Sequence, residues 1–203
     1  MTQTPGKSET RSGVNRREFL QGSGAAAAAT ALASSGQAFA QEAASSAVIS
    51  GSTKISLQVN GADHEVTVEP RTTLLEVLRY QLDLTGAKPV SGDGSSGAST
   101  VLVDGKPVAA STTLAITTRG KPIQTVESLG EGGLDPVPAA FVEHDAQQCG
   151  FCTPGFVVAV RAFLNQNPNA TEQQIREGLN GNICRCGTYA NVIQAAISVV
   201  KGA

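Results

Sequence analysis

The sequence lacks tryptophan, and its 203 residues include only one methionine, two histidines and four cysteines. His64 and His144 stand apart from the cysteines and are interpreted as structural or exposed, because an isolated histidine is weak support for a site. No basic run of about five to eight residues occurs, so nucleic acid and anionic membrane are poor candidate partners. The chemistry of the chain is therefore expected at its few cysteines.

Long hydrophobic runs are missing as well. The alanine-rich stretch Ala25–Ala33 is about half of the ~18 residues that favour a membrane-spanning helix, and no other segment competes for that role. Arg16-Arg17 precedes this stretch, and Ala38-Phe39-Ala40 follows it as an A-x-A cleavage site. This order predicts a twin-arginine signal peptide over residues 1–40, rather than an alanine-rich tail, and export to the periplasm. Twin-arginine export moves folded proteins, which suits a cofactor that is inserted beforehand.

A strong net charge of either sign is also absent, since the whole chain carries −2 at neutral pH. Removal of residues 1–40 leaves 11 basic and 15 acidic residues and a net charge of −4. Mild acidity of this kind is ordinary for a soluble protein. The mature chain, with a flexible segment over residues 41–52, can hold one medium domain or two small ones.

Residues 53–126 have the pattern of a strand-rich domain. Lys54–Val59 alternates apolar and polar side chains, Asn60-Gly61 is typical of a hairpin turn, and Val66–Val68 resumes the alternation. Further short strands are expected at Thr100–Val103, near Val108 and at Pro122–Val126.

A helix is predicted between these strands. Thr73–Glu76 fits a capping box, and an apolar face through Leu82 extends over about three turns before Asp83 ends it. A glycine- and serine-rich loop over residues 91–99 follows. The order hairpin, helix, long loop, hairpin and last strand is that of a ubiquitin-like β-grasp.

Residues 127–137 are glycine-rich, contain Pro136 and are predicted to be a linker. Beyond this linker the apolar residues recur every three to four positions, as in helices. Four short helices are expected: one containing Phe141–His144, one from the cap Thr153 through Leu164, one opened by the capping box Thr171–Gln174, and one from about Tyr189. Residues 138–203 are therefore predicted to form an all-α four-helix bundle domain, which makes the whole chain α+β.

The four cysteines fall in two pairs near predicted helix starts. Cys149 and Cys152 form a C-x2-C pair before one helix, and Cys184 and Cys186 form a C-x-C pair before another. Four thiolates are the number that a [2Fe–2S] cluster takes when every ligand is cysteine. From spacing alone, structural zinc, two disulfides and a thiol redox pair at Cys149 and Cys152 remain alternatives.

The residues beside the cysteines suit a cluster. Helix N-termini present unpaired N–H groups and a partial positive charge, both of which stabilise thiolates. Gly150 and Gly187 are expected to let the backbone approach the sulfurs closely. Phe151 and Ile183 are expected to shield the centre.

Residues 139–195 resemble the iron–sulfur subunit or domain of the xanthine oxidase family of molybdenum hydroxylases. One signature is Phe141–Asp145 with Gln148–Gly155, and the other is Gly181–Tyr189. The resemblance extends back to about residue 53, and it implies a β-grasp domain of the plant-type ferredoxin kind followed by a helical [2Fe–2S] domain. The twin-arginine signal is similar to that of the periplasmic aldehyde oxidoreductases of this family.

The resemblance also implies a role for each matching residue. The ligands of the cluster nearest the molybdenum cofactor match Cys149, Cys152, Cys184 and Cys186. Cys186 matches the ligand beside the pterin, and Gln148 matches a residue that hydrogen-bonds the pterin. The pterin would lie on a large partner subunit, and Arg185 is expected to brace the loop or the partner interface.

The chain departs from the family pattern at four positions. A second cluster is normally held there by C-x4-C-x2-C…C, as in plant-type ferredoxins, but the matching residues here are Ser91, Ser96, Ser99 and Ser111. Pro89-Val90 also stands where the family usually has a glycine. A serine hydroxyl loses its proton far less readily than a thiol and is a harder ligand, so the second [2Fe–2S] cluster is predicted to be absent.

The leading hypothesis is an electron-transfer subunit of a periplasmic molybdenum hydroxylase that oxidises aldehydes or N-heterocycles. Catalysis would occur on the molybdopterin-binding large subunit, so no catalytic residue is assigned to this chain. A FAD subunit or a cytochrome c is the expected electron acceptor. One alternative is a non-redox scaffold of such a complex, with cysteines that are idle, disulfide-bonded or zinc-loaded, and another is thiol–disulfide exchange through Cys149 and Cys152.

Overall fold

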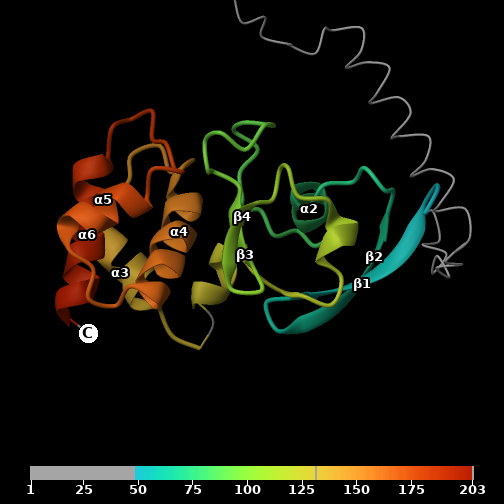
Figure 1. The fold of residues 1–203 in the computed structure, drawn as a ribbon, viewed down its shortest axis with the longest axis horizontal. Helices are drawn as coiled ribbons and strands as arrows, with labels where there is room; N and C mark the ends of the chain where they lie inside the picture. The colour runs from blue at the N-terminus through green and yellow to red at the C-terminus, as the bar shows by residue number, and fades with distance from the viewer. Residues whose placement is uncertain (1–48, 131, 203) are drawn as a thin grey trace, which may run out of the picture. The chain divides into compact units, whose positions relative to one another are not determined.

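A computed structural model describes residues 49–130 and 132–202. The predicted signal peptide and most of the predicted segment 41–52 lie outside the described residues. Ile49–Ala203 group into one compact unit, in which the strands precede the longer helices and α4 lies beside β3 (Figure 1). No described helix is long and apolar enough to cross a membrane.

The predicted hairpin is confirmed. Strand β1 (Thr53–Val59) pairs antiparallel with β2 (Ala62–Val68), and Val59 lies opposite Ala62. Asn60 and Gly61 between them have φ values of +51° and +83°, as a type I′ two-residue turn requires. Alternate residues of β1 are buried, so this strand turns one face to the core.

The three later strands complete a five-stranded sheet in the order β2-β1-β5-β3-β4. At its centre, β5 (Pro122–Gln124) runs parallel to β1 and antiparallel to β3 (Thr100–Val103). Strand β4 (Lys106–Ala109) pairs antiparallel with β3 at the edge. All three predicted strands are therefore present, although β5 ends two residues before the expected Val126.

The helix predicted after the hairpin begins as expected but does not continue as a regular α-helix. The Thr73 hydroxyl accepts a hydrogen bond from the Glu76 N–H at 3.2 Å, and the Glu76 carboxylate accepts one from the Thr73 N–H at 2.7 Å. This capping box opens α2 (Leu74–Glu76), which widens into the π-helix η2 (Val77–Gln81). The buried residues of the two segments still lie on one helical face. They are Leu74, Leu75, Val77 and Leu78.

Four helices follow, as predicted: α3 (Pro136–Glu143), α4 (Thr153–Gln166), α5 (Glu172–Gly178) and α6 (Tyr189–Gly202). Two boundaries differ from the prediction. Helix α3 begins within the predicted linker 127–137 and ends one residue before His144, and Cys152 rather than Thr153 is the N-cap of α4. Pro154 still fits in the first turn, where its missing N–H costs nothing. The sequence pattern does not predict two short 3₁₀ turns, η3 (Ala115–Thr118) and η4 (Val126–Gly130).

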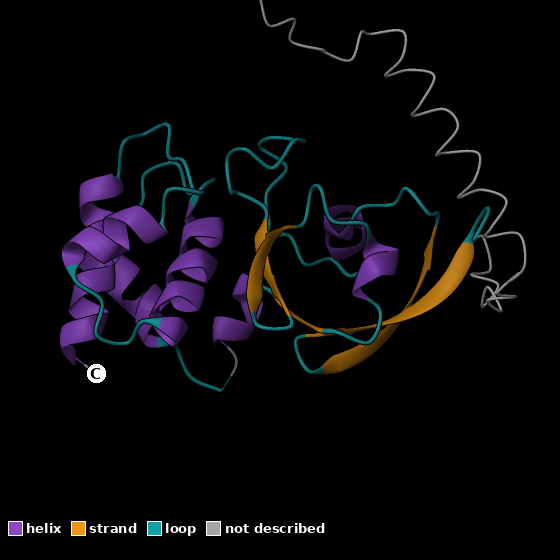
Figure 2. Cartoon of the chain, viewed as in Figure 1, coloured by secondary structure: helices purple, strands orange, loops and turns teal. Residues whose placement is uncertain are grey.

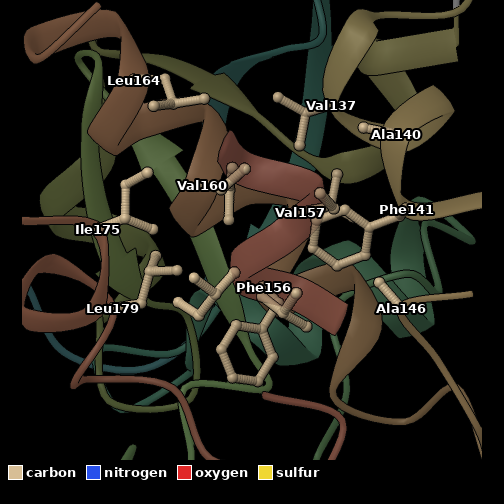
Figure 3. Close-up of a cluster of buried hydrophobic side chains, with 14 of the residues drawn as sticks. Val137, Ala140, Phe141, Ala146, Phe156, Val157, Val160, Leu164, Ile175 and Leu179 are labelled. Atoms are coloured by element: carbon tan, nitrogen blue, oxygen red, sulfur yellow. The ribbon is translucent and has the colours of Figure 1, made fainter. Parts of the chain in front are cut away.

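The helices and the sheet each contribute a buried apolar cluster. Phe156, Val160 and Ile175 lie within the cluster among the helices, each no more than 1% exposed (Figure 3). The cluster beneath the sheet includes Leu57 and Leu74, both 0% exposed. A third, small cluster joins β3 to α4 and consists of Leu102, Val158 and Ala162. The described chain is thus a mixed α/β structure, as expected.

Candidate metal centre

The four cysteines lie in two loops at the starts of α4 and α6, which confirms their predicted placement. Cys149 and Cys152 directly precede α4, and Cys184 and Cys186 lie between α5 and α6. Both cysteine-bearing loops are drawn in teal above the helices in the view of Figure 2. We refer to residues 181–187 as the cysteine loop.

Thiols from the two loops approach each other. The Cys186 thiol donates to Cys149 Sγ across a sulfur–sulfur distance of 3.5 Å. All four are free: Cys149 and Cys186 are exposed, Cys152 is half-buried and Cys184 is buried. Each loop therefore supplies one surface thiol and one inner thiol. Among the described residues, no three His, Cys, Asp or Glu side chains form a preformed single-ion site.

Cys184 is held by the start of α6. Its N–H donates to the Tyr189 hydroxyl at 2.8 Å, and its sulfur accepts from the Thr188 hydroxyl at 3.2 Å. Burial acts to raise the pKa of Cys184, but hydrogen bonds from the Thr188 hydroxyl, from the Thr188 N–H and from Cys152 lower it to about 7. The Tyr189 ring meets Phe156 edge-on, with 6.1 Å between ring centroids, and so links the cysteine loop to the core.

Cys152 behaves in the opposite way. Burial raises the pKa of Cys152 to about 12, and the hydrogen bond and negative charge of Cys184 act in the same direction. The adjacent Thr153 hydroxyl is buried and has no hydrogen-bond partner among the described residues. An unpartnered buried hydroxyl is costly, and acceptor atoms of a group bound beside Cys152 are one way to satisfy it.

The pKa values of Cys149 and Cys186 are shifted in opposite directions. The backbone N–H of Phe151 lowers the pKa of Cys149, and the thiol of Cys186 lowers it further. The backbone N–H of Cys149 acts to lower the pKa of Cys186. The hydrogen bond that the Cys186 thiol donates to Cys149, burial, and the negative charges of Cys149 and Cys184 outweigh this and raise the pKa of Cys186. Each loop thus contains one cysteine of lowered pKa, Cys149 in the first and Cys184 in the second.

This donor set fits a [2Fe–2S] cluster. Such clusters are held by cysteine thiolates, and hydrogen bonds to the sulfurs tune them. Here the sulfur of Cys184 accepts from a buried hydroxyl, that of Cys149 from a backbone N–H, and the Thr153 hydroxyl is left over beside Cys152. Soft thiolate donors also exclude the oxygen-preferring cations Mg²⁺ and Ca²⁺ from this site.

One expectation about the flanking residues is wrong. Gly150 and Gly187 have φ values of +82° and +83°, and apart from their chain neighbours nothing lies within 4 Å of where a Cβ atom would stand in either residue. The left-handed backbone by itself favours glycine at both positions. Phe151 and Ile183 are 56% and 53% exposed, so they border the thiols at the surface instead of shielding them.

The other residues singled out in the sequence lie as follows. Gln148 and Arg185 are exposed beside the cysteines. His144 caps α3, and its Nε2 is buried without a partner among the described residues. His64 lies on β2 opposite Leu57, which agrees with a structural role.

Three residues that hold the cysteine loop were missed: Asn182, Thr188 and Tyr189. Their only signal is membership of the string Gly181–Tyr189, which gives no residue-level reason for their presence. Thr188 and Tyr189 bond Cys184 directly. Asn182 reaches a distant loop instead, where its side-chain amide donates to the Gly97 carbonyl at 3.0 Å.

The four serines that match the second ligand set form two hydrogen-bonded pairs. Ser91 and Ser96 have their Oγ atoms 2.7 Å apart, and the Ser96 N–H donates to Ser91 Oγ at 3.0 Å. Ser99 Oγ donates to Ser111 Oγ at 3.1 Å and accepts from the Ser111 N–H at 3.3 Å. The first three belong to residues 91–99, which we call the serine loop. Their hydroxyls thus satisfy one another.

Comparison with known proteins agrees with a cluster-binding helical part. Residues 125–197 match the family described as a [2Fe-2S] binding domain. Residues 13–33, which lie outside the described structure, match the twin-arginine translocation signal sequence. The predicted export signal is therefore supported.

The chain is 42% identical over 144 residues to the nicotine 6-hydroxylase small subunit of Paenarthrobacter nicotinovorans, over 71% of this chain and 87% of that subunit. It is 38% identical over 198 residues to the aldehyde oxidoreductase iron-sulfur-binding subunit of Escherichia coli, over 90% and 86%. Its structure matches a chain of quinoline 2-oxidoreductase from Pseudomonas putida 86 with a TM-score of 0.71 and 38% identity, over 75% of this chain and 96% of that chain. The chain therefore belongs to the iron–sulfur-binding small subunits of the xanthine oxidase family of molybdenum hydroxylases.

Proposed function

We propose that this chain is the electron-transfer subunit of an exported molybdenum hydroxylase and holds one [2Fe–2S] cluster with Cys149, Cys152, Cys184 and Cys186. The observation that carries the proposal is the meeting of the two cysteine pairs, with the sulfurs of Cys149 and Cys186 3.5 Å apart. The pairs meet in a chain whose relatives are small or iron–sulfur-binding subunits of oxidoreductases.

The two loops would hold the cluster from two sides. Cys152 and Cys184 lie inward and would keep water from one side, whereas Cys149 and Cys186 lie at the surface. When bound, a [2Fe–2S] cluster supplies one-electron transfer. The Thr188 hydroxyl and the backbone N–H groups would stabilise negative charge on the sulfurs. The exposed thiols would face a partner.

We assign residues 53–126 to a β-grasp domain of the plant-type ferredoxin kind, 127–135 to a linker and the residues from Pro136, where α3 begins, to the cluster-binding four-helix bundle, two residues earlier than the expected boundary after residue 137. The central position of β5 between β1 and β3 supports the β-grasp assignment. Separate buried clusters under the sheet and among the helices support the division. The linker is tied to the first domain, because the Glu127 carboxylate accepts from the Gly86 N–H at 2.7 Å.

The serine loop is proposed to hold no second cluster. The hydroxyls of Ser91, Ser96, Ser99 and Ser111 already bond one another in pairs. Iron–sulfur chemistry prefers soft thiolate ligands, and a serine hydroxyl does not ionise near neutral pH. Electrons would therefore enter and leave this chain at the cysteine site alone.

The substrate would be oxidised on a molybdopterin-binding large subunit. Relatives are named for aldehyde oxidoreductase and for the N-heterocycle nicotine, so an aldehyde or an N-heterocycle is the proposed substrate class of the complex. Cys186 and Gln148, both exposed, are proposed to lie nearest the pterin. A FAD subunit or a cytochrome c would accept the electrons. The signal at residues 13–33 supports export, and we propose the periplasm as the destination.

The deciding experiment is metal analysis and EPR of the mature chain purified without oxygen. We expect about two irons per chain and an EPR signal that appears on one-electron reduction. About four irons would overturn the single-cluster proposal. Zinc in place of iron, or reduction without any EPR signal, would instead indicate the structural scaffold.

A further inference from the structure

The serine loop lies directly against the cysteine loop. The Ile183 N–H donates to the Ser96 carbonyl at 3.0 Å. The Asn182 side-chain amide donates to the Gly97 carbonyl at 3.0 Å, in a buried bond between residues 85 positions apart. Ile183 and Asn182 immediately precede Cys184, so both bonds act on the backbone that carries a cluster ligand.

The two loops and the start of α4 approach so closely that residues 97 and 155 must be glycine. A Cβ atom on Gly97 would stand 2.5 Å from the Gly181 carbonyl oxygen and 2.6 Å from Asn182 Nδ2. A Cβ atom on Gly155, in the first turn of α4, would stand 2.3 Å from the Gly97 carbonyl oxygen. The serine loop therefore packs against both the cysteine loop and the start of α4. These are the two segments next to the cysteine pairs.

The serine loop is fixed by its own hydroxyls. Ser91 Oγ accepts from the Ser96 N–H at 3.0 Å and pairs with Ser96 Oγ, which closes the loop just before Gly97. Ser99, which is 3% exposed, bonds Ser111 and ties the other end of the loop to the residues after β4. The loop thus has a defined shape that needs no metal.

We propose that the serine loop is a metal-free clamp that sets the position of the cysteine loop, with Asn182 and Ser91 as positioning residues for Cys184 and Cys186. This inference rests on the proposed function, because it assigns these residues an influence on the bound cluster. Asn182 couples the two loops directly. Ser91 acts through the shape of the serine loop. The β-grasp domain therefore acts on the cysteine site through hydrogen bonds rather than through a cluster of its own.

The first test compares Asn182→Ala with Asn180→Ala in the full mature chain as isolated. Asn180 is an exposed neighbour of the same residue type and serves as the matched control. Loss of the buried amide frees the cysteine loop, and we expect hydrogen–deuterium exchange at the Ile183 amide to rise roughly tenfold. We also expect roughly tenfold faster iron release to a chelator and an altered EPR line shape of the reduced cluster. Asn180→Ala should match the wild type in all three measurements.

The second test uses Ser91→Ala and Ser91→Thr, with Ser95→Ala as the control. Ser95 lies in the same loop but bonds only Asp93 at the surface. Ser91→Ala should change exchange, iron release and line shape in the same direction as Asn182→Ala but less, and Ser91→Thr should restore them because it keeps the hydroxyl. If Asn182→Ala does not fold, the comparison of Ser91→Ala with Ser91→Thr still tests whether the serine loop positions the cysteine loop.

Three outcomes would overturn the inference. Exchange at Ile183 could be the same in Asn182→Ala and Asn180→Ala, or it could rise while iron release and EPR stay unchanged. Equal behaviour of Ser91→Ala and Ser91→Thr would also contradict it. If the variants bind about two irons but show no such differences, the clamp fails and the proposed function stands. If the wild type itself binds no iron, it is the proposed function that fails.

Discussion

The strand part of the chain carries four paired serines and the helical part four paired cysteines. Ser99 and Ser111 exchange two hydrogen bonds, at 3.1 and 3.3 Å, and Ser99 is buried. Cys149 and Cys186 share a single sulfur–sulfur contact of 3.5 Å, and both are exposed. The serine hydroxyls are thus satisfied within the chain, whereas the cysteine sulfurs, as thiolates, have lone pairs that can bind a metal.

The difference follows from the chemistry of oxygen and sulfur. A hydroxyl is a strong donor and acceptor, so two of them close a loop on themselves. A thiol is a weak donor and acceptor, but its thiolate is a strong ligand for soft metals. The serine pairs therefore suit a hydrogen-bonded cross-link within the chain, and the cysteine pairs suit a metal site.

The largest expected effect comes from making one cysteine resemble the serines. Cys184→Ser changes the size of the side chain little but replaces the sulfur that accepts from the Thr188 hydroxyl. We expect iron affinity to fall by more than the roughly 10–100-fold that loss of an outer-shell partner causes. Iron content and visible absorption of the variant measure this loss. Ser95→Ala should retain its iron, and full iron occupancy in Cys184→Ser would contradict the ligand assignment.

A smaller effect is expected when the serine pairing is broken. Ser99→Ala leaves the Ser111 N–H and hydroxyl without their partner in a part-buried site. An unsatisfied buried donor costs about 1–3 kcal/mol, and because water can partly reach Ser111, the free energy of unfolding should fall by about 1 kcal/mol. Urea unfolding measures it. Ser95→Ala, at the surface of the same loop, should cost less than about 0.5 kcal/mol, and equal losses in both variants would show that the pairs contribute nothing.

Short-range patterns predicted most of the elements. The Asn60-Gly61 turn, the capping boxes at Thr73 and Thr171 and the start of α6 depend on residues a few positions apart, and each is present. The placement of both cysteine pairs before helices depends on the same rules. These features were predictable because hydrogen bonds within one turn determine them.

Features that depend on tertiary packing were not predictable. The helical period predicted the buried apolar face of the helix after the hairpin but not its π-helical turn at Val77–Gln81. The bond from Asn182 to Gly97 spans 85 positions, and no local pattern announces it. The positive φ values of Gly150 and Gly187 were not predicted, because φ is not visible in a sequence.

The smallest expected effect concerns a second matched pair, the two capping boxes. In the strand part Glu76 accepts from the Thr73 N–H at 2.7 Å, and in the helical part Gln174 accepts from the Thr171 N–H at 2.8 Å. Only the first box titrates. The backbone N–H of Thr73, and then its hydroxyl, lower the pKa of Glu76 below its usual value.

Because the folded-state pKa of Glu76 is lowered, its contribution is complete above the unfolded value of about 4.3 and is lost as the pH falls through the folded value. Glu76→Gln keeps an acceptor at every pH, so the stability difference between wild type and variant should shrink or reverse in acid. Glu76 is largely exposed, which limits the change to well under about 1 kcal/mol. Urea unfolding from about pH 6 to about pH 3 measures it. Gln174→Glu should introduce the same acid sensitivity into α5, and parallel pH profiles for wild type and Glu76→Gln would show that the first box does not titrate in this way.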